Sequence, residues 1–78
     1  MKIEIFGTGC PKCQGLDRSV RKIADELKLD AEIVKITDIS EMVKRGVLTV
    51  PALFVDGKKK SEGRVPNEND LVRILKGE

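Results

Sequence analysis

Short apolar runs and amphipathic helix patterns alternate in the first half of the sequence. Residues 2–6 alternate β-branched and polar positions, and the glycine-rich residues 7–9 follow, which predicts a strand that ends in a flexible loop. From Pro11 to about Lys28, apolar residues recur every three or four positions, which predicts a helix. Residues 31–36 are short and rich in β-branched side chains, so we expect a second strand. The opening is therefore predicted to be β-α-β, and the apolar stripe of its helix consists of Leu16, Val20, Ile23, Ala24 and Leu27.

A second, shorter helix is predicted between Asp38 and Gly46. Asp38 with Glu41 three residues later is typical of a capping box, and a glycine suits the C-terminal end of a helix. The small apolar face of this helix is expected to hold Ile39, Met42 and Val43.

The last third of the chain has the strongest turn signal. Asp56-Gly57 between residues 52–55 and 58–62 predicts a two-residue β-hairpin, because this dipeptide accepts the positive φ angles of a type I′ turn. Asn67 can cap a final helix that Gly77 ends. The side chains expected to face the core from this helix are Leu71, Ile74 and Leu75.

The predicted order β-α-β-α-β-β-α defines the fold class. It indicates an α/β protein with a mixed four-stranded sheet flanked by helices, in one domain that spans residues 1–78. The loop after the first strand then lies at a carboxyl edge of the sheet, where α/β proteins tend to place ligands and chemistry.

Composition narrows the functional classes. Of 78 residues, 40% are hydrophobic and 36% charged, and the formal net charge is only +2, so neither disorder nor non-specific nucleic-acid binding is favoured. Apolar runs of membrane-spanning length are missing from the sequence, and an acidic residue at position 4 stands where a signal peptide would be apolar. We therefore expect a cytoplasmic protein that binds neither membranes nor nucleic acid. We also expect it to be a monomer.

Two cysteines carry the candidate chemistry. The chain has no histidine, which removes Cys-His pairs and histidine-bearing metal sites. Cys10 begins the first helix, where free backbone N–H groups and the helix dipole favour a thiolate and are expected to lower the thiol pKa below its free value of roughly 8.5. Cys13 lies one turn further, close enough to attack a mixed disulfide on Cys10. Lys12 would favour the thiolate if its side chain points that way, although it can equally point into water.

Two other interpretations of the cysteines stay open from the residues alone. They could fill space in the core, although a loop with proline, lysine and glycines is a poor core position. They could bind a metal, although structural zinc takes four ligands and this pair supplies two.

Two segments together resemble a known family. Gly9-Cys10-Pro11-Lys12-Cys13, combined with residues 48–58 (LTVPALFVDGK), is similar to the thioredoxin superfamily, and more narrowly to the very small glutaredoxin-sized redox-active disulfide proteins of archaea and bacteria. The resemblance covers nearly the whole chain. It implies a thiol-disulfide oxidoreductase without a bound cofactor, which acts on disulfide-containing proteins and is reduced by a reductase or a low-molecular-weight thiol.

The resemblance also implies a substrate groove. It predicts a cis peptide bond between Val50 and Pro51, with Pro51 packed across from the disulfide and the backbone of Val50 pairing with substrate. Pro11 and Lys12, within the cysteine motif, would border the same groove. Thr49 would lie beside it or serve only as a β-forming residue.

Two departures from the relatives limit what the resemblance implies, and the second of them concerns glutathione binding. The Pro11-Lys12 pair is nearer to the glutaredoxin pattern than to the thioredoxin one, but the region after the last strand has a single glycine, Gly63, where glutaredoxins usually have two. Gly63 either lets the backbone approach the cysteine loop or turns the chain toward the last helix.

Glu4 stands six residues before Cys10, the spacing at which thioredoxins keep a buried acid. If Glu4 faces the helix layer, burial is expected to raise its pKa and let it act as a general acid and base for Cys13. If it faces solvent, it is only a polar strand residue.

A heavy-metal chaperone is the alternative function. Such domains have a similar length and a Cys-x-x-Cys after the first strand, and two thiolates suit Cu(I) or Zn(II). Their order is β-α-β-β-α-β, whereas this sequence predicts an additional helix before Pro51 and a terminal helix.

Overall fold

The computed structural model describes residues 1–77 and has the element order predicted from the sequence. The elements are β1 (Lys2–Phe6), α1 (Pro11–Glu26), β2 (Glu32–Ile36), α2 (Ile39–Lys44), β3 (Ala52–Val55), β4 (Lys58–Glu62) and α3 (Glu68–Lys76).

The four strands form one mixed sheet in the order β2-β1-β3-β4. β1 runs parallel to β2 and antiparallel to β3, and β4 returns antiparallel to β3. Phe6 at the end of β1 pairs with Ala52 at the start of β3. The loop after β1 and the segment that enters β3 therefore meet at one end of the sheet, and this α/β architecture confirms the predicted fold class.

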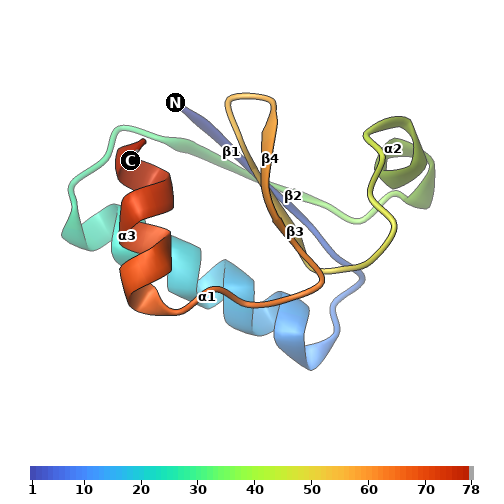
Figure 1. Ribbon diagram of the computed structural model, residues 1–78, viewed down its shortest axis with the longest axis horizontal. Coiled ribbons are helices and arrows are strands. Elements are labelled where there is room, and N and C mark those ends of the chain that lie inside the picture. The colour runs from blue at the N-terminus through green and yellow to red at the C-terminus, as the bar shows by residue number, and fades with distance from the viewer. Residues whose placement is uncertain (78) are drawn as a thin grey trace.

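One face of the sheet is covered by α1 and α3; in Figure 1 α1 lies below the strands and α3 stands to their left. The strands contribute alternate residues to this core, as expected for a sheet with both faces covered. Its buried members are Ile3, Ile5, Leu16, Val20, Ile23, Leu53, Val55, Leu71 and Leu75.

The opposite face has a smaller core beneath α2, which lies at one end of the molecule (Figure 1). This core consists of Phe6, Met42, Val47, Ala52 and Phe54. The predicted apolar face of α2 is wrong at two of its three positions, because Ile39 and Val43 are 68% and 72% exposed. A six-residue helix contacts the sheet through about one turn, and here only Met42 occupies that turn.

Backbone angles explain the element ends. Asp56 and Gly57 both have positive φ, 51° and 83°, as the hairpin prediction requires. The Asn67 side chain accepts a hydrogen bond from the Asp70 backbone N–H at 2.8 Å and caps α3. α1 ends at Glu26, two residues before the predicted end, because Lys28 adopts a left-handed φ of 53°.

Within residues 1–77, no helix combines the length and the apolar character that crossing a membrane requires.

Candidate redox site

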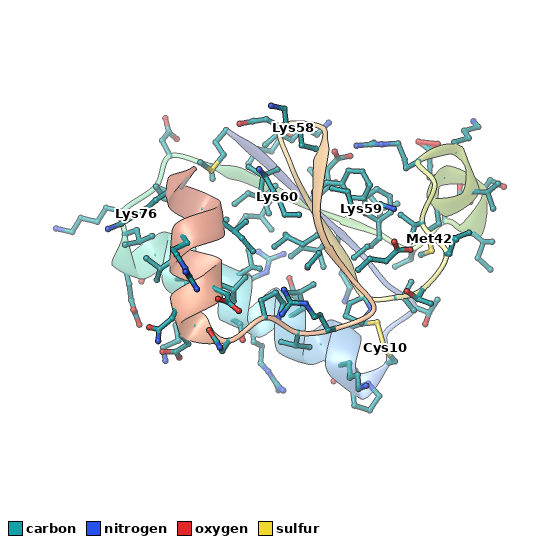
Figure 2. All side chains as sticks on the ribbon, viewed as in Figure 1. Cys10, Met42, Lys58, Lys59, Lys60 and Lys76 are labelled. Carbon is teal, nitrogen blue, oxygen red and sulfur yellow. A yellow bond between two sulfur atoms is a disulfide. The ribbon has the colours of Figure 1, made fainter. Side chains whose placement is uncertain are left out.

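Cys10 and Cys13 form a disulfide at the start of α1, with their Cα atoms 5.0 Å apart. Cys10 is the N-cap residue, and its Sγ accepts a hydrogen bond from the Cys13 backbone N–H at 3.2 Å. Cys10 is half-buried, whereas Cys13 is only 1% exposed. Figure 2 shows the disulfide at the end of the molecule opposite the hairpin tip at Lys58. A reagent from solution therefore meets Cys10 before Cys13.

Gly7 makes room for the buried sulfur. A Cβ atom at this position would lie 2.7 Å from Cys13 Sγ and 2.8 Å from Cys13 Cβ, closer than real contacts allow. The backbone N–H of Gly7 is tied to Ile36 O at 3.0 Å, so the glycine cannot easily move away. The sequence predicts only a loop at Gly7, because this contact depends on how α1 packs on β1.

Pro51 lies at the same end of the sheet. It immediately precedes Ala52, the partner of Phe6, so the β1–β3 register places Pro51 beside the start of the loop that follows β1. Pro51 is buried, and the Val50–Pro51 peptide bond is cis. Val50, just before it, is half-buried.

Gly63 packs against the segment that precedes Pro51. Its N–H donates to Pro51 O at 2.8 Å, and a Cβ atom there would lie 2.8 Å from Thr49 Oγ1. Gly63 has a φ of +76°, which also favours glycine. Gly63 thus approaches Thr49 and Pro51, whereas the approach predicted from the sequence was to the cysteine loop.

Pro11 and Lys12 both lie on the exposed side of the first turn of α1. Pro11 occupies the first turn, where its missing N–H leaves no hydrogen bond unmade. Both residues border the half-buried Cys10.

The position and the pKa of Glu4 differ from those expected of a general acid and base for Cys13. It is buried, at 5% exposure, but it lies on the α2 side of β1, away from the α1 layer. Its two carboxylate oxygens accept hydrogen bonds from the Arg45 guanidinium at 2.9 and 2.6 Å. The prediction of a raised pKa is wrong, because the hydrogen bonds and charge of Arg45 outweigh the desolvation and lower the pKa of Glu4.

Glu62 was not predicted from the sequence as a site residue, but it contacts the segment that leads to Pro51. Its carboxylate accepts hydrogen bonds from the backbone N–H groups of Leu48 and Thr49, just before Val50 and Pro51. Lys59 adds an ion pair at 2.9 Å. These interactions lower the pKa of Glu62 to about 2. No local motif reveals them, because the partners are 13 and 14 residues apart.

The sequence matches a family described as "Thioredoxin domain" over residues 1–76. It is 41% identical over 75 residues to a thioredoxin of Methanothermobacter thermautotrophicus, a match that covers 96% of this chain and 97% of the relative. It is 42% identical over 74 residues to a thioredoxin of Methanocaldococcus jannaschii, covering 95% of this chain and 85% of the relative.

Solved structures agree on the fold. Thioredoxin-2 of a malaria parasite superposes with a TM-score of 0.77 at 17% identity, covering 99% of this chain and 82% of the other. Thioredoxin 1 of Thermosipho africanus superposes with a TM-score of 0.69 at 23% identity, covering 99% and 92%. With the family match, the curated relatives and the Cys10–Cys13 disulfide, these likenesses establish that the chain belongs to the thioredoxin family of thiol-disulfide oxidoreductases.

Proposed function

We propose that Cys10 is the attacking thiol and Cys13 the resolving thiol of a protein disulfide reductase. The observation that carries this assignment is the difference in burial, since Cys10 is half-buried at the helix start and Cys13 is 1% exposed behind it. The helix N-terminus favours a thiolate at Cys10, because free backbone N–H groups and the helix dipole stabilise negative charge there.

The reaction follows thiol-disulfide exchange. The Cys10 thiolate attacks one sulfur of a substrate disulfide, forms a mixed disulfide and releases the other sulfur as a thiolate. Cys13, once deprotonated, attacks Cys10 Sγ, breaks the mixed disulfide and releases the second substrate thiolate. Two electrons pass from the dithiol to the substrate, and the released thiolates take up the two protons that the cysteine thiols lose. The Cys10–Cys13 disulfide is the product form of the protein.

Substrate is proposed to bind along the segment that enters β3. Val50 would pair its backbone with an extended stretch of substrate, flanked by Thr49 and Pro51 on one side and by Pro11 and Lys12 on the other. The register that places Pro51 beside the start of the loop that follows β1 supports this placement. Gly63 supports it indirectly, through its contacts with Thr49 and Pro51.

The electron donor is proposed to be a reductase or a low-molecular-weight thiol, and the site of action the cytoplasm, where thiols are kept reduced. The chain has two cysteines and both belong to one reactive pair, which is consistent with a compartment that keeps thiols reduced. The protein is proposed to act as a monomer, which agrees with two cores that are closed within one chain. A glutaredoxin-like use of glutathione is tested by measuring whether glutathione reduces the Cys10–Cys13 disulfide.

The heavy-metal chaperone alternative is not favoured. The order has α2 between β2 and β3, which departs from the β-α-β-β-α-β order of those domains. The family match also points to redox chemistry.

Matched single-cysteine variants test the assignment. With a disulfide-bonded protein such as insulin, Cys13→Ser should accumulate a mixed disulfide through Cys10, detected by mass, because the resolving thiol is missing. Cys10→Ser should trap far less, since its remaining thiol is buried. Iodoacetamide should modify Cys10 of the reduced wild type first, and equilibration in dithiothreitol buffers should follow a two-electron curve. Equal trapping by both variants, or protection of both thiols only by added Cu(I) or Zn(II), would refute the proposal.

A further inference from the structure

The four residues before Val50, numbered 46–49, are fastened to the end of β4. One carboxylate oxygen of Glu62 accepts hydrogen bonds from the backbone N–H groups of Leu48 and Thr49. Lys59 donates to the other oxygen at 2.9 Å and to Gly46 O at 3.1 Å. Both ends of the 46–49 segment are thus held by two side chains of one strand.

The fastened segment presents a large apolar side chain to solvent. Leu48 is 91% exposed, the highest value among the large exposed hydrophobic residues of the described chain. A single exposed leucine is common on protein surfaces. Here, however, the backbone N–H of Leu48 is held by Glu62, and Leu48 lies three residues before Pro51, which directly precedes the Ala52–Phe6 pair at the end of β1.

Glu62 cannot act as a general acid, because its carboxyl group stays ionised at neutral pH. Two backbone N–H groups and the Lys59 ammonium all favour its charged form, and its pKa is about 2. It is therefore a carboxylate throughout the neutral range. Its contacts are to the 46–49 segment, so any effect on the reaction must pass through that segment.

We propose that Leu48 is a specificity-determining residue that contacts polypeptides beside their disulfide, and that Glu62 and Lys59 are positioning residues that hold it in place. The inference rests on the proposed function and names its substrate class: disulfides in polypeptides with apolar side chains near the cysteine. A preformed segment binds with little loss of conformational freedom, whereas a small disulfide reaches Cys10 without covering Leu48.

The test compares two substrates in single turnover of the pre-reduced protein. Insulin represents polypeptide disulfides, and 5,5′-dithiobis(2-nitrobenzoate) represents small ones. Leu48→Ser should lower the second-order rate constant for insulin about tenfold, as expected for losing much of one buried leucine contact. It should change the rate constant for the small disulfide less than about twofold. The matched control is Ile39→Ser, which replaces another exposed apolar residue, 68% exposed at the start of α2, and should alter neither rate.

The positioning role has its own signature. Glu62→Ala should lower the insulin rate as Leu48→Ser does, and the double variant should be no slower than either single one, because both act through the same contact. Glu62→Gln keeps an acceptor oxygen for the two N–H groups and should restore most of the rate. Circular dichroism checks that each variant is folded. If Glu62→Ala does not fold, the insulin rates of the two single variants Glu62→Gln and Leu48→Ser are compared instead.

Two failures are distinguishable. A wild-type protein that reduces neither substrate refutes the proposed function and the inference with it. A wild-type protein that reduces both, together with a Leu48→Ser variant whose insulin-to-small-disulfide ratio is unchanged, overturns the inference alone.

Discussion

Individual residues of the site are held by contacts that are distant in sequence. Gly7 is the clearest case, because the space that a Cβ atom would need is filled by Cys13 Sγ. Gly15, in the middle of α1, has nothing within 4 Å of its Cβ position. The two glycines therefore have opposite requirements, although the sequence offers no sign of this.

Gly7→Ala should destabilise the oxidised protein by about 1–3 kcal/mol, since Cys13 or the backbone must shift to admit the methyl group. Gly15→Ala, the matched control, should stabilise it by roughly 0.5–1 kcal/mol, because alanine is the better helix former. Urea unfolding followed by far-ultraviolet circular dichroism measures both, and suits a chain without Trp or Tyr. Equal effects of the two substitutions would contradict the packing argument.

Elements are joined across the sheet by a few polar contacts. Arg45, just after α2, reaches Glu4 on β1 and places its guanidinium carbon 5.5 Å from the Phe6 ring centroid and 4.9 Å from that of Phe54. The ion pair and the two aromatic rings together hold α2 on its face of the sheet. This gives Glu4 a structural partner, and the pKa that Arg45 lowers does not favour the proton-transfer role predicted from its spacing to Cys10.

Glu4→Gln should lower the free energy of unfolding by about 2 kcal/mol, because Arg45 loses a partner at a mostly buried site. At pH 7 the rate with a small disulfide should change less than about twofold, because a carboxyl whose pKa is lowered by Arg45 is a poor proton donor at that pH. Glu32→Gln on the exposed side of β2 serves as the control. A large loss of rate with unchanged stability would instead restore the general acid and base role.

Ser61 on β4 is a second polar residue in an apolar place. It is 7% exposed, it pairs with Leu53 of the larger core, and its hydroxyl oxygen has no hydrogen-bond partner among residues 1–77. Ser61→Ala should therefore be neutral or stabilise the fold by up to about 1 kcal/mol, because it removes an unpaired buried hydroxyl. Chemical denaturation measures the difference, and a loss of more than about 1 kcal/mol would mean that the hydroxyl has a partner.

The sequence predicted the elements well where the signal is local. The Asp56-Gly57 turn and the Asn67 cap depend on residues within a few positions of one another, and both are present. The apolar face of α2 was wrong because the position of a short helix on the sheet decides which side is buried. The Arg45–Glu4 pair spans 41 residues and depends on sheet register, which no periodicity in the sequence encodes.

The site residues also divide into those that a local motif predicts and those that depend on contacts between distant segments. The Cys10-x-x-Cys13 motif and Pro51 were recognisable from the sequence, because both belong to short motifs. Gly7 and Glu62 were missed, because their roles arise only when β1, α1 and β4 come together.

At the scale of the whole molecule, two carboxyl groups among residues 1–77 link the free energy of unfolding to pH. The pKa of Glu4 and that of Glu62 are both lowered from an ordinary value of 4.5, to about 2 for Glu62. Between the ordinary and the lowered values the unfolded chain binds more protons than the folded one. Their stabilising effect is therefore complete above about pH 4.5 and is lost as the pH falls through the folded values.

The oxidised protein should show a free energy of unfolding that is nearly constant between about pH 5.5 and 7, because the chain has no histidine to titrate there. Below about pH 4.5 it should fall, and the fall should be smaller in Glu4→Gln. Urea titrations at a series of pH values measure this. A steep change between pH 6 and 7 in the disulfide form would contradict the prediction.

The Cys10 Sγ atom has two functions. It is the proposed reacting atom, and it also caps α1 by accepting a hydrogen bond from the Cys13 backbone N–H. Reduction, substrate attachment or alkylation each changes the charge or the substituents of that sulfur. The Cys13 amide proton is consequently a built-in reporter of redox state, and its chemical shift should distinguish each form of the protein without any label on the sulfur.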